Sequence, residues 1–244
     1  IGNGQLGASL FGGVLTDQIL FNEKTLWTGI NVTDGNYTCY GNNVKYGAYQ
    51  LFGNLYAHNL DEFGFSKESP VQDYVRTLDL DNALGTVQFA SPDGTVQYQR
   101  EYFVSYPDKA IVAHYTASQG GTLNLRFDME SGKPGVVAAT TYADGRGRFK
   151  GKLNTVSYAA EFCVVPTGGT MTTAEDGVTV READEVTVIL VAQTDYDAYS
   201  TTYIKNTAQL AANVTATVDA ASAKSYAELK EAHVADFTQF MGRV

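Results

Sequence analysis

Residues 86–104, TVQFASPDGTVQYQREYFV, contain the clearest strand–turn–strand pattern in the chain. The segment Ser91-Pro92-Asp93-Gly94 has proline and glycine where a tight turn requires them, because proline fixes its own backbone and glycine accepts a left-handed conformation. After the turn, residues 96–104 alternate between two faces, as in an extended strand. This pattern predicts a β-hairpin and places the chain in the β class.

Further strands are expected on both sides of this hairpin, because short apolar or alternating segments bounded by turn residues are typical of strands. They cover residues 6–21 (two strands), 50–56, 71–80, 110–115, 123–127, 156–165, 178–181 and 186–192. Segment 186–192 is apolar on both faces, so we expect it in the middle of a sheet. Residues 30–48 and 129–151 are polar and glycine-rich and are predicted to be long loops.

The pattern changes near the C-terminus. Apolar residues recur at helical spacing over Thr207–Ala221 and again over Tyr226–Met241. Ser225, with Glu228 three residues later, predicts a capping box at the start of the second helix. We therefore expect a mainly β protein, with a β-sandwich domain over residues 1–204 and a helical linker over residues 205–244.

Composition limits the possible partners. The chain has 244 residues, 44% of them hydrophobic and 18% charged, and a net charge of −10. This acidic balance argues against nucleic acid and against anionic membrane surfaces as partners, because both require clustered lysine and arginine. No apolar run is long enough to cross a membrane. The chain begins at Ile1 without an initiator methionine, so we expect a trimmed or mature fragment.

Several sequence patterns could indicate a cofactor or metal, but their surroundings do not support one. Gly2-Asn3-Gly4-Gln5-Leu6-Gly7 matches a dinucleotide-binding pattern, yet no helix is expected after it, so we interpret it as a turn. Asp79-x-Asp81-Asn82 lacks the remaining ligands of a calcium loop and is also interpreted as a turn. Cys39 and Cys163 form no zinc motif or disulfide framework, and we expect two unpaired thiols. The sequence thus predicts no cofactor and no metal.

Catalytic residues are equally hard to identify. No G-x-S-x-G nucleophile motif is present. The three histidines show no ligand spacing and are expected to be packing or surface residues: His58, His114 and His233. The acidic residues that could form a glycosidase pair are expected to be solvated instead: Glu23, Glu101, Glu130, Glu161, Asp195 and Asp197. We expect no catalytic residue in this segment.

The candidate functional stretch is Asn22-Glu23-Lys24-Thr25-Leu26-Trp27-Thr28-Gly29, which contains the only tryptophan. A strand with one dry face does not need this mixture of polar and large apolar side chains, whereas a loop at an interface or at the rim of a sugar pocket does. The candidate site residues are Asn22, Glu23, Thr25 and Trp27. Trp27 could be an aromatic platform facing a sugar, or an anchor in the core or at a domain interface.

The ordered motifs resemble the N-terminal domain of glycoside hydrolase family 95, the α-L-fucosidases, which is related to the corresponding domain of family 65. The matching segments are Ile1-Gly2-Asn3-Gly4-x-Leu6-Gly7-Ala8, Asn22-Glu23-x-Thr25-Leu26-Trp27-x-Gly29, Tyr49-Gln50-x-x-Gly53-x-Leu55, Tyr74-x-Arg76-x-Leu78-Asp79-Leu80, Tyr98-x-Arg100-Glu101-x-Phe103-x-Ser105-x-Pro107-Asp108, Ala183-Asp184-Glu185 with Thr194-Asp195-Tyr196, and Tyr226-x-x-Leu229-x-x-x-His233-x-x-Asp236 with Arg243-Val244. The sequence departs from the family pattern at Gln5, Lys24, Leu51 and Phe52.

The resemblance implies an antiparallel β-supersandwich, a helical linker and then an (α/α)₆ barrel that carries catalysis and would follow Val244. It implies that this segment is a non-catalytic N-terminal domain that scaffolds the barrel and shapes the edge of its sugar pocket. The implied partners are that barrel and a fucosylated or related glycan, and the implied location is secreted or periplasmic in a bacterium. A stand-alone carbohydrate-binding module and a surface adhesion domain remain alternatives. We also expect exposed apolar surface around Leu26, Trp27 and the terminal helix.

Overall fold

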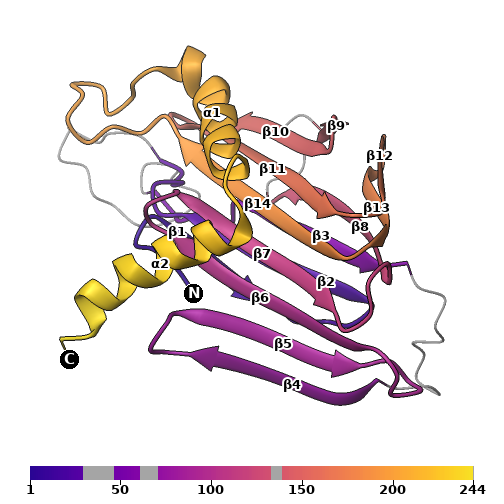
Figure 1. Cartoon of the computed structure of the whole chain (residues 1–244). Coiled ribbons are helices and arrows are strands. Elements are labelled where there is room, and N and C mark those ends of the chain that lie inside the picture. Colours follow the sequence, from indigo (N-terminus) through magenta and orange to yellow (C-terminus); the bar gives the residue numbers. More distant parts are fainter. Residues whose placement is uncertain (30–46, 61–70, 133–138, 244) are drawn as a thin grey trace.

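The structure, a computed structural model, describes residues 1–29, 47–60, 71–132 and 139–243. Over these residues the chain forms two antiparallel sheets followed by two helices (Figure 1). The six-stranded sheet has the order β1 (Leu6–Leu10), β2 (Thr16–Glu23), β3 (Gly53–Asn59), β8 (Leu123–Ser131), β13 (Gly177–Ala183) and β12 (Thr170–Ala174). The eight-stranded sheet has the order β4 (Gln72–Asp79), β5 (Leu84–Ala90), β6 (Gln97–Ser105), β7 (Ala110–Ala117), β14 (Glu185–Thr194), β11 (Ser157–Thr167), β10 (Arg146–Lys152) and β9 (Thr141–Ala143). The predicted β-supersandwich with C-terminal helices is confirmed.

The main core lies between the two sheets and is formed by alternate residues of each strand. On β2, Ile19 and Phe21 point inward, while Gln18 and Asn22 lie on the outer face. Phe21 contacts Phe52, which lies just before β3, and Phe149, which lies on β10 of the other sheet. Because strand side chains alternate between faces, the sequence pattern decides which residues enter this core.

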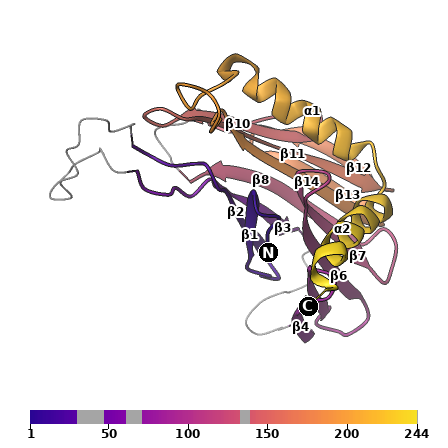
Figure 2. The same ribbon diagram turned by 90° about the vertical axis from the view of Figure 1, so that its left-hand side faces the viewer.

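The helices α1 (Leu210–Ser222) and α2 (Tyr226–Met241) cover the outer face of the eight-stranded sheet, and a short 3₁₀ turn, Thr207–Gln209, precedes them (Figure 2). A second apolar core lies under them, with Val214 and Val218 of α1 packed on Ile189 and Val191 of β14. This explains why β14 is apolar on both faces, and its predicted central position is confirmed. The predicted capping box of Ser225 and Glu228 is also confirmed. The division at residue 204 stays a prediction.

The predicted loop over residues 129–151 is wrong in the part that the structure describes. The region contains the end of β8, β9 and β10, and β12 was not predicted. On β10, Gly147 and Phe149 point into the core while Arg146, Arg148 and Lys150 lie outside. Gly147 leaves room for the Phe162 ring, which would be 2.3 Å from an added Cβ. Because glycine takes an inward position where an apolar side chain is usual, the alternation of this strand is not apparent from its composition. Residues 133–138 and most of the predicted 30–48 loop lie outside the described residues.

Three of the acidic residues expected to be solvated are instead buried: Glu23, Glu161 and Asp195. Each accepts hydrogen bonds, Glu23 from the nearby Thr25 and the other two from residues far along the chain. Glu161 accepts hydrogen bonds from Arg146 and Thr215, and the Asp195 carboxylate accepts them from the Ser157 amide and the Thr207 hydroxyl. A buried carboxylate needs such partners, and sequence alone does not show them.

The remaining local predictions are confirmed where they can be checked. The Gly2–Gly7 segment forms a turn closed by a Gly2–Gly7 bridge, and Asp79 accepts hydrogen bonds from the amides of Asp81 and Asn82. His114 of β7 and His233 of α2 are buried packing residues at the contact between the helix and the sheet. They lie against the rings of Tyr226 and Phe103, respectively. Cys163 is a free, buried thiol, and Cys39 lies outside the described residues.

Two absences concern only the described part of the chain. Its helices are too short or too polar to span a bilayer. In the same ranges, no group of three or more histidine, cysteine, aspartate or glutamate residues could hold a metal ion.

Candidate functional site

The Asn22–Gly29 motif begins at the end of β2, where the chain extends past the edge of the sandwich. Beyond Glu23, residues 24–28 run beside residues 47–50, with a bridge between Trp27 and Tyr49. The Thr28 amide donates to the Ala48 carbonyl and the Gln50 amide donates to the Leu26 carbonyl, both at 3.0 Å. The Lys24 amide donates at 3.0 Å to Gln5 in the glycine-rich turn. The motif is therefore held on two sides by backbone hydrogen bonds.

Glu23 is the buried polar centre of the motif. Its Oε2 accepts hydrogen bonds from the Thr25 amide at 2.8 Å and from the Thr25 hydroxyl at 2.5 Å. The Thr25 hydroxyl also contacts the hydroxyl of Thr194 at the end of β14. Burial raises the pKa of the Glu23 carboxyl, and the hydrogen bonds from Thr25 oppose that rise. The arrangement ties the loop to the central strand of the other sheet.

Leu26 and Trp27 point in opposite directions. Leu26 is fully buried in the main core, whereas Trp27 is 47% exposed. The Trp27 indole Nε1 donates at 2.9 Å to the Lys24 carbonyl, and its ring centroid lies 5.5 Å from that of Tyr49. Asn22 does not point toward Trp27, because its side-chain oxygen accepts from the Phe52 amide at 3.1 Å. The indole is thus oriented by its own loop while nearly half of the side chain stays exposed.

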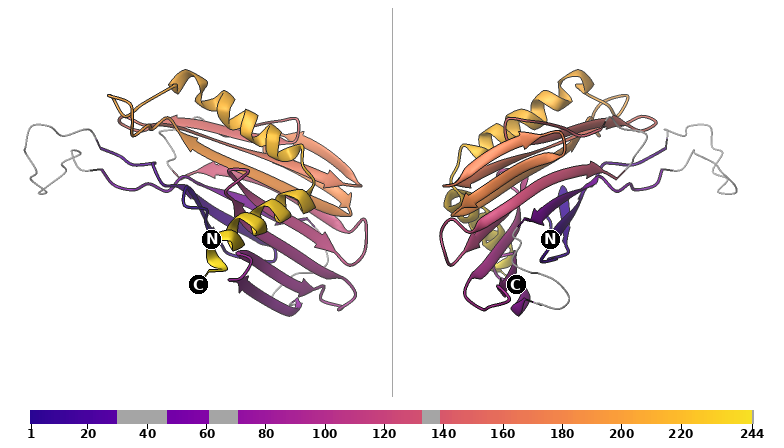
Figure 3. Two further views of the ribbon diagram at one scale, coloured as in Figure 1. Left: turned by 60° about the vertical axis from the view of Figure 1, so that its left-hand side comes forward. Right: turned by 90° about the vertical axis from the view of Figure 1, so that its right-hand side faces the viewer.

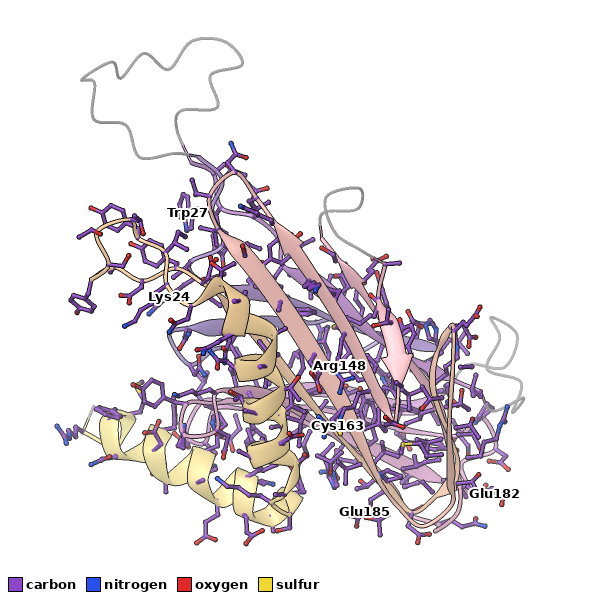
Figure 4. The ribbon with its side chains drawn as sticks, turned by 90° about the horizontal axis from the view of Figure 1, so that it is seen from above. Lys24, Trp27, Arg148, Cys163, Glu182 and Glu185 are labelled. Atoms are coloured by element: carbon purple, nitrogen blue, oxygen red, sulfur yellow. The ribbon has the colours of Figure 1, made fainter. Side chains whose placement is uncertain are left out.

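A cavity of about 560 Å³ lies next to the motif. The motif lines one side with Lys24, Thr25, Trp27 and Thr28, and the β10–β11 turn and the segment after β14 line the rest. Figure 4 shows Lys24 and Trp27 at one end of the sandwich, with Glu182 and Glu185 at the opposite end. The lining residues from beyond the motif are Gly47, Thr155, Val156, Tyr196, Thr202, Tyr203 and Ile204, together with Gly29 at its end.

Partly exposed aromatic rings gather at this cavity. We call Trp27, Tyr49, Tyr196 and Tyr203 the Trp27 surface; each is between 42% and 47% exposed. Tyr196 and Tyr203 stack nearly parallel, with ring centroids 6.3 Å apart. Among the described lining residues none is an aspartate, glutamate or histidine. The cavity can therefore pack against a ring or an apolar side chain, but these residues supply no acid–base pair.

The structure brings together part of the predicted site. Thr25 and Trp27 line the cavity, Glu23 lies buried beneath them, and Asn22 faces the β3 side. The tyrosines of the 196–203 segment were missed as site residues. The signal available was the density of tyrosine and aspartate in DYDAYSTTY (195–203), which is unusual for a simple linker. Whether the four predicted residues act at an interface or a sugar pocket stays a prediction.

Sequence comparisons with known proteins give matches over most of the sandwich. The family model described as glycosyl hydrolase family 65, N-terminal domain, matches residues 1–45 and 34–199. Over 155 residues the chain is 32% identical to alpha-L-fucosidase 2 of Arabidopsis thaliana, a match that covers 54% of this chain. The same match covers 18% of that protein, so the chain corresponds to a small part of its length.

A solved structure supports the same fold. A protein assigned as a kojibiose phosphorylase from the human microbiome superimposes with a TM-score of 0.58. The superposition covers 95% of this chain and 35% of the other, at 10% sequence identity, which is a likeness of fold alone. The resemblance drawn from the ordered motifs is confirmed by the family model and the fucosidase match. The chain belongs to the family of N-terminal domains of glycosyl hydrolase family 65.

Proposed function

We propose that this chain is the non-catalytic N-terminal domain of an α-L-fucosidase-like glycoside hydrolase. In this role it scaffolds a catalytic (α/α)₆ barrel and forms part of the edge of the barrel's sugar pocket. Family membership and the 32% identity to a fucosidase support the enzyme class. The barrel and the fucosylated or related glycan are partners implied by the family resemblance.

The observation that carries the proposal is the Trp27 surface. Four half-exposed aromatic rings gather at one end of the sandwich, around a cavity of about 560 Å³. Exposed aromatic clusters on soluble proteins mark interaction sites, because removing such apolar surface from water lowers the free energy. The chain cannot leave these rings exposed without cost, so a docking or ligand-binding role accounts for them.

The support beneath this surface suits a pocket edge. The Glu23–Thr25–Thr194 contacts join the loop to β14, and the bond from Trp27 to the Lys24 carbonyl restricts the indole. A side chain fixed in this way loses little entropy when a partner binds, which favours precise positioning. In the proposed enzyme, the barrel would supply the acid and base, and Trp27 would supply a flat wall near the sugar.

The test uses the whole protein in which this chain is the N-terminal part. We expect it to hydrolyse α-L-fucosides, and we expect Trp27→Ala to lower kcat/KM about tenfold or more while the circular dichroism spectrum is unchanged. Met171→Ala is the matched control, because Met171 is also partly exposed but lies on the edge strand β12. Absence of fucosidase activity would contradict the enzyme class. An active Trp27→Ala protein with unchanged kinetics would contradict only the pocket-edge role.

A second candidate function is a stand-alone carbohydrate-binding module. The neighbouring rings of Trp27 and Tyr49 favour it, because aromatic side chains can pack on the apolar face of a sugar ring. Calorimetry of the isolated chain with fucosylated oligosaccharides separates the two functions. Binding tighter than about 1 mM, roughly −4 kcal/mol, supports the module. No heat of binding together with an active whole enzyme supports the scaffold.

The family resemblance is also the basis for proposing that the protein acts outside the bacterial cytoplasm, in the periplasm or the medium. Fractionation of the producing cells tests this. Recovery of the protein in the cytoplasmic fraction alone would contradict it.

A further inference from the structure

A polar cavity of about 790 Å³ lies on the outer face of the six-stranded sheet, away from the Trp27 surface. Its floor is formed by outward-facing residues of β2, β3 and β8, whose alternate neighbours enter the main core. We call it the β3–β8 pocket. In the described ranges, both helices lie on the other sheet, so no described helix covers this face (Figure 3). Its main polar residues are Thr16, Tyr56, His58, Arg126, Asp128 and Glu130.

A chain of hydrogen bonds orders one half of the pocket. His58 Nε2 lies 2.6 Å from Asp128 Oδ2, and His58 Nδ1 lies 3.2 Å from the Thr16 hydroxyl. A carboxylate can only accept, so Nε2 donates to Asp128, and Nδ1 is hydrogen-bonded to the Thr16 hydroxyl. Arg126 lies 3.6 Å from the same Asp128 oxygen and 3.2 Å from Asp176. Four polar groups from three strands are therefore fixed relative to one another.

The other half combines a carboxylate with an aromatic ring. The Tyr56 hydroxyl donates at 2.6 Å to Glu130 Oε1, and Asn54 donates to the same oxygen at 3.2 Å. The Tyr56 ring stacks on His58 with centroids 6.1 Å apart. Burial and the neighbouring Glu130 raise the pKa of Tyr56 to about 12, which keeps its hydroxyl protonated. The pocket thus presents carboxylates, a guanidinium and a flat ring side by side.

The charges select the kind of ligand. Asp128, Glu130, Glu175 and Asp176 outnumber the one arginine of the lining, so the pocket repels phosphates and uronates. A carboxylate has about four lone-pair sites, and hydroxyl groups that donate to it form charge-assisted hydrogen bonds. A guanidinium donates to ring or hydroxyl oxygens, and a tyrosine ring packs on C–H groups. A ligand that has neighbouring hydroxyl groups and an apolar ring face therefore matches the carboxylates, the guanidinium and the tyrosine ring.

We propose that the β3–β8 pocket binds a neutral pyranose unit of a glycan, as a second sugar site independent of the Trp27 surface. Its volume lies within the range of about 300–1,000 Å³ that is usual for small-ligand sites. Binding in this pocket would hold the protein on a polysaccharide while another site acts on the same polysaccharide. The proposal does not depend on the Trp27 surface having any sugar affinity.

The experiment is an amide NMR titration of the ¹⁵N-labelled chain. The probes are the methyl glycosides of L-fucose, D-galactose, D-xylose and D-glucose, with methyl D-glucuronide as the anionic comparison. We expect at least one neutral glycoside to cause saturable shifts at residues 54–58 and 126–130, and the glucuronide to bind more weakly than the glucoside. Tighter binding of the glucuronide would overturn the assignment to neutral sugars.

Variants decide which residues bind the sugar. Glu130→Gln keeps the shape of the side chain and an acceptor for Tyr56, and it should weaken binding about tenfold. Tyr56→Phe is the second variant and should also weaken binding, even if Glu130→Gln proves unstable. Leu78→Ala is the control and should leave the affinity unchanged, because Leu78 is an exposed residue of β4 in the other sheet. The proposal is overturned if no neutral glycoside gives saturable shifts, if the shifts fall on the Trp27 surface, or if neither pocket variant changes them. The NMR titration does not measure fucosidase activity, so its result is independent of the test of the proposed enzyme.

Discussion

Leu26 and Trp27 are neighbours in sequence, yet their side chains have opposite environments. The backbone at these residues is paired with residues 49–50, so successive side chains point to opposite sides as in a strand. Leu26 thereby enters the main core, and Trp27 remains 47% exposed. The same alternation explains why this motif mixes large apolar residues with polar ones.

This difference predicts unequal costs of truncation. Leu26→Ala should lower the free energy of unfolding by about 2–5 kcal/mol, because it leaves a cavity in a closed core. Trp27→Ala should cost clearly less, since much of the ring already contacts water. Urea unfolding followed by far-ultraviolet circular dichroism measures both. Equal losses would mean that Trp27 is buried in the chain itself, against the interface or pocket-edge role.

Glu23 gives the second prediction at this scale, a pH dependence. Burial raises the folded-state pKa of Glu23 above the ordinary value of 4.5. Between the two pKa values the folded chain therefore binds more protons than the unfolded chain, so the free energy of unfolding falls as pH rises. The contribution is fully present below about pH 4.5 and is lost as pH rises through the folded-state pKa. The Glu23→Gln variant cannot ionise at this position, so it does not lose this contribution. Its free energy of unfolding relative to the native protein should therefore increase from pH 4.5 toward pH 7.

Urea unfolding at several pH values between 4.5 and 7.5 tests this. Glu182→Gln is the matched control, because Glu182 is an exposed glutamate at the other end of the sandwich (Figure 4). A difference between Glu23→Gln and the native protein that does not change with pH would show that the pKa of Glu23 is not raised.

At the scale of elements, α2 depends on a mixed set of contacts rather than on an apolar stripe alone. Tyr226 stacks on His114 of β7, with ring centroids 3.7 Å apart, and Lys230 forms an ion pair with Glu101 of β6 at 2.9 Å. Leu229 is fully buried in the second core, but Phe240 near the end of the helix is 61% exposed. The expected apolar surface at the terminal helix is therefore limited to its last turn, and Leu26 does not contribute to exposed surface.

The capping box makes the start of α2 testable. The Ser225 hydroxyl accepts from the Glu228 amide, and the Glu228 carboxylate accepts from the Ser225 amide at 2.8 Å. Ser225→Ala should lower the stability of the helix by about 1 kcal/mol, because one amide of the first turn loses its partner. Hydrogen exchange of the α2 amides should accelerate while β14 is unaffected. Ser222→Ala, at the end of α1, is the control, and equal acceleration by both variants would contradict a role for the cap.

At the scale of the whole molecule, the eight-stranded sheet separates two cores, and β14 supplies side chains to both. Leu190 lies in the core between the sheets, and Ile189 lies in the core under the helices. Both are about 1% exposed, whereas Leu78 on the edge strand β4 is 55% exposed. The C-terminal helices therefore stabilise the sandwich and do not merely follow it.

Alanine substitutions on the two faces of β14 test this arrangement. Ile189→Ala and Leu190→Ala should each lower the free energy of unfolding by about 2–5 kcal/mol. Leu78→Ala should change it by no more than about 0.5 kcal/mol, as is usual for exposed positions. Urea unfolding provides the values. If Ile189→Ala cost as little as Leu78→Ala, the helices would not be packed on the sheet in solution.

The sequence by itself determined the features that depend on local periodicity. Alternation gave the hairpin at Ser91–Gly94 and most of the strands, helical spacing gave α1 and α2, and Ser225 with Glu228 gave the cap. The two apolar faces of segment 186–192 were enough to place β14 in the middle of a sheet. These features rest on neighbours a few residues apart, which is why they could be predicted from the residues alone.

Only the tertiary structure decided which distant residues meet. Thr25 contacts Thr194 although 169 positions separate them, and that contact fixes the candidate motif to the opposite sheet. The burial of Glu23, the position of Tyr196 and Tyr203 beside Trp27, and the β3–β8 pocket all depend on the order of strands within each sheet. Periodicity tells which face a side chain occupies, but a hydrogen-bond partner or a cavity wall from another strand is set by how the sheets assemble.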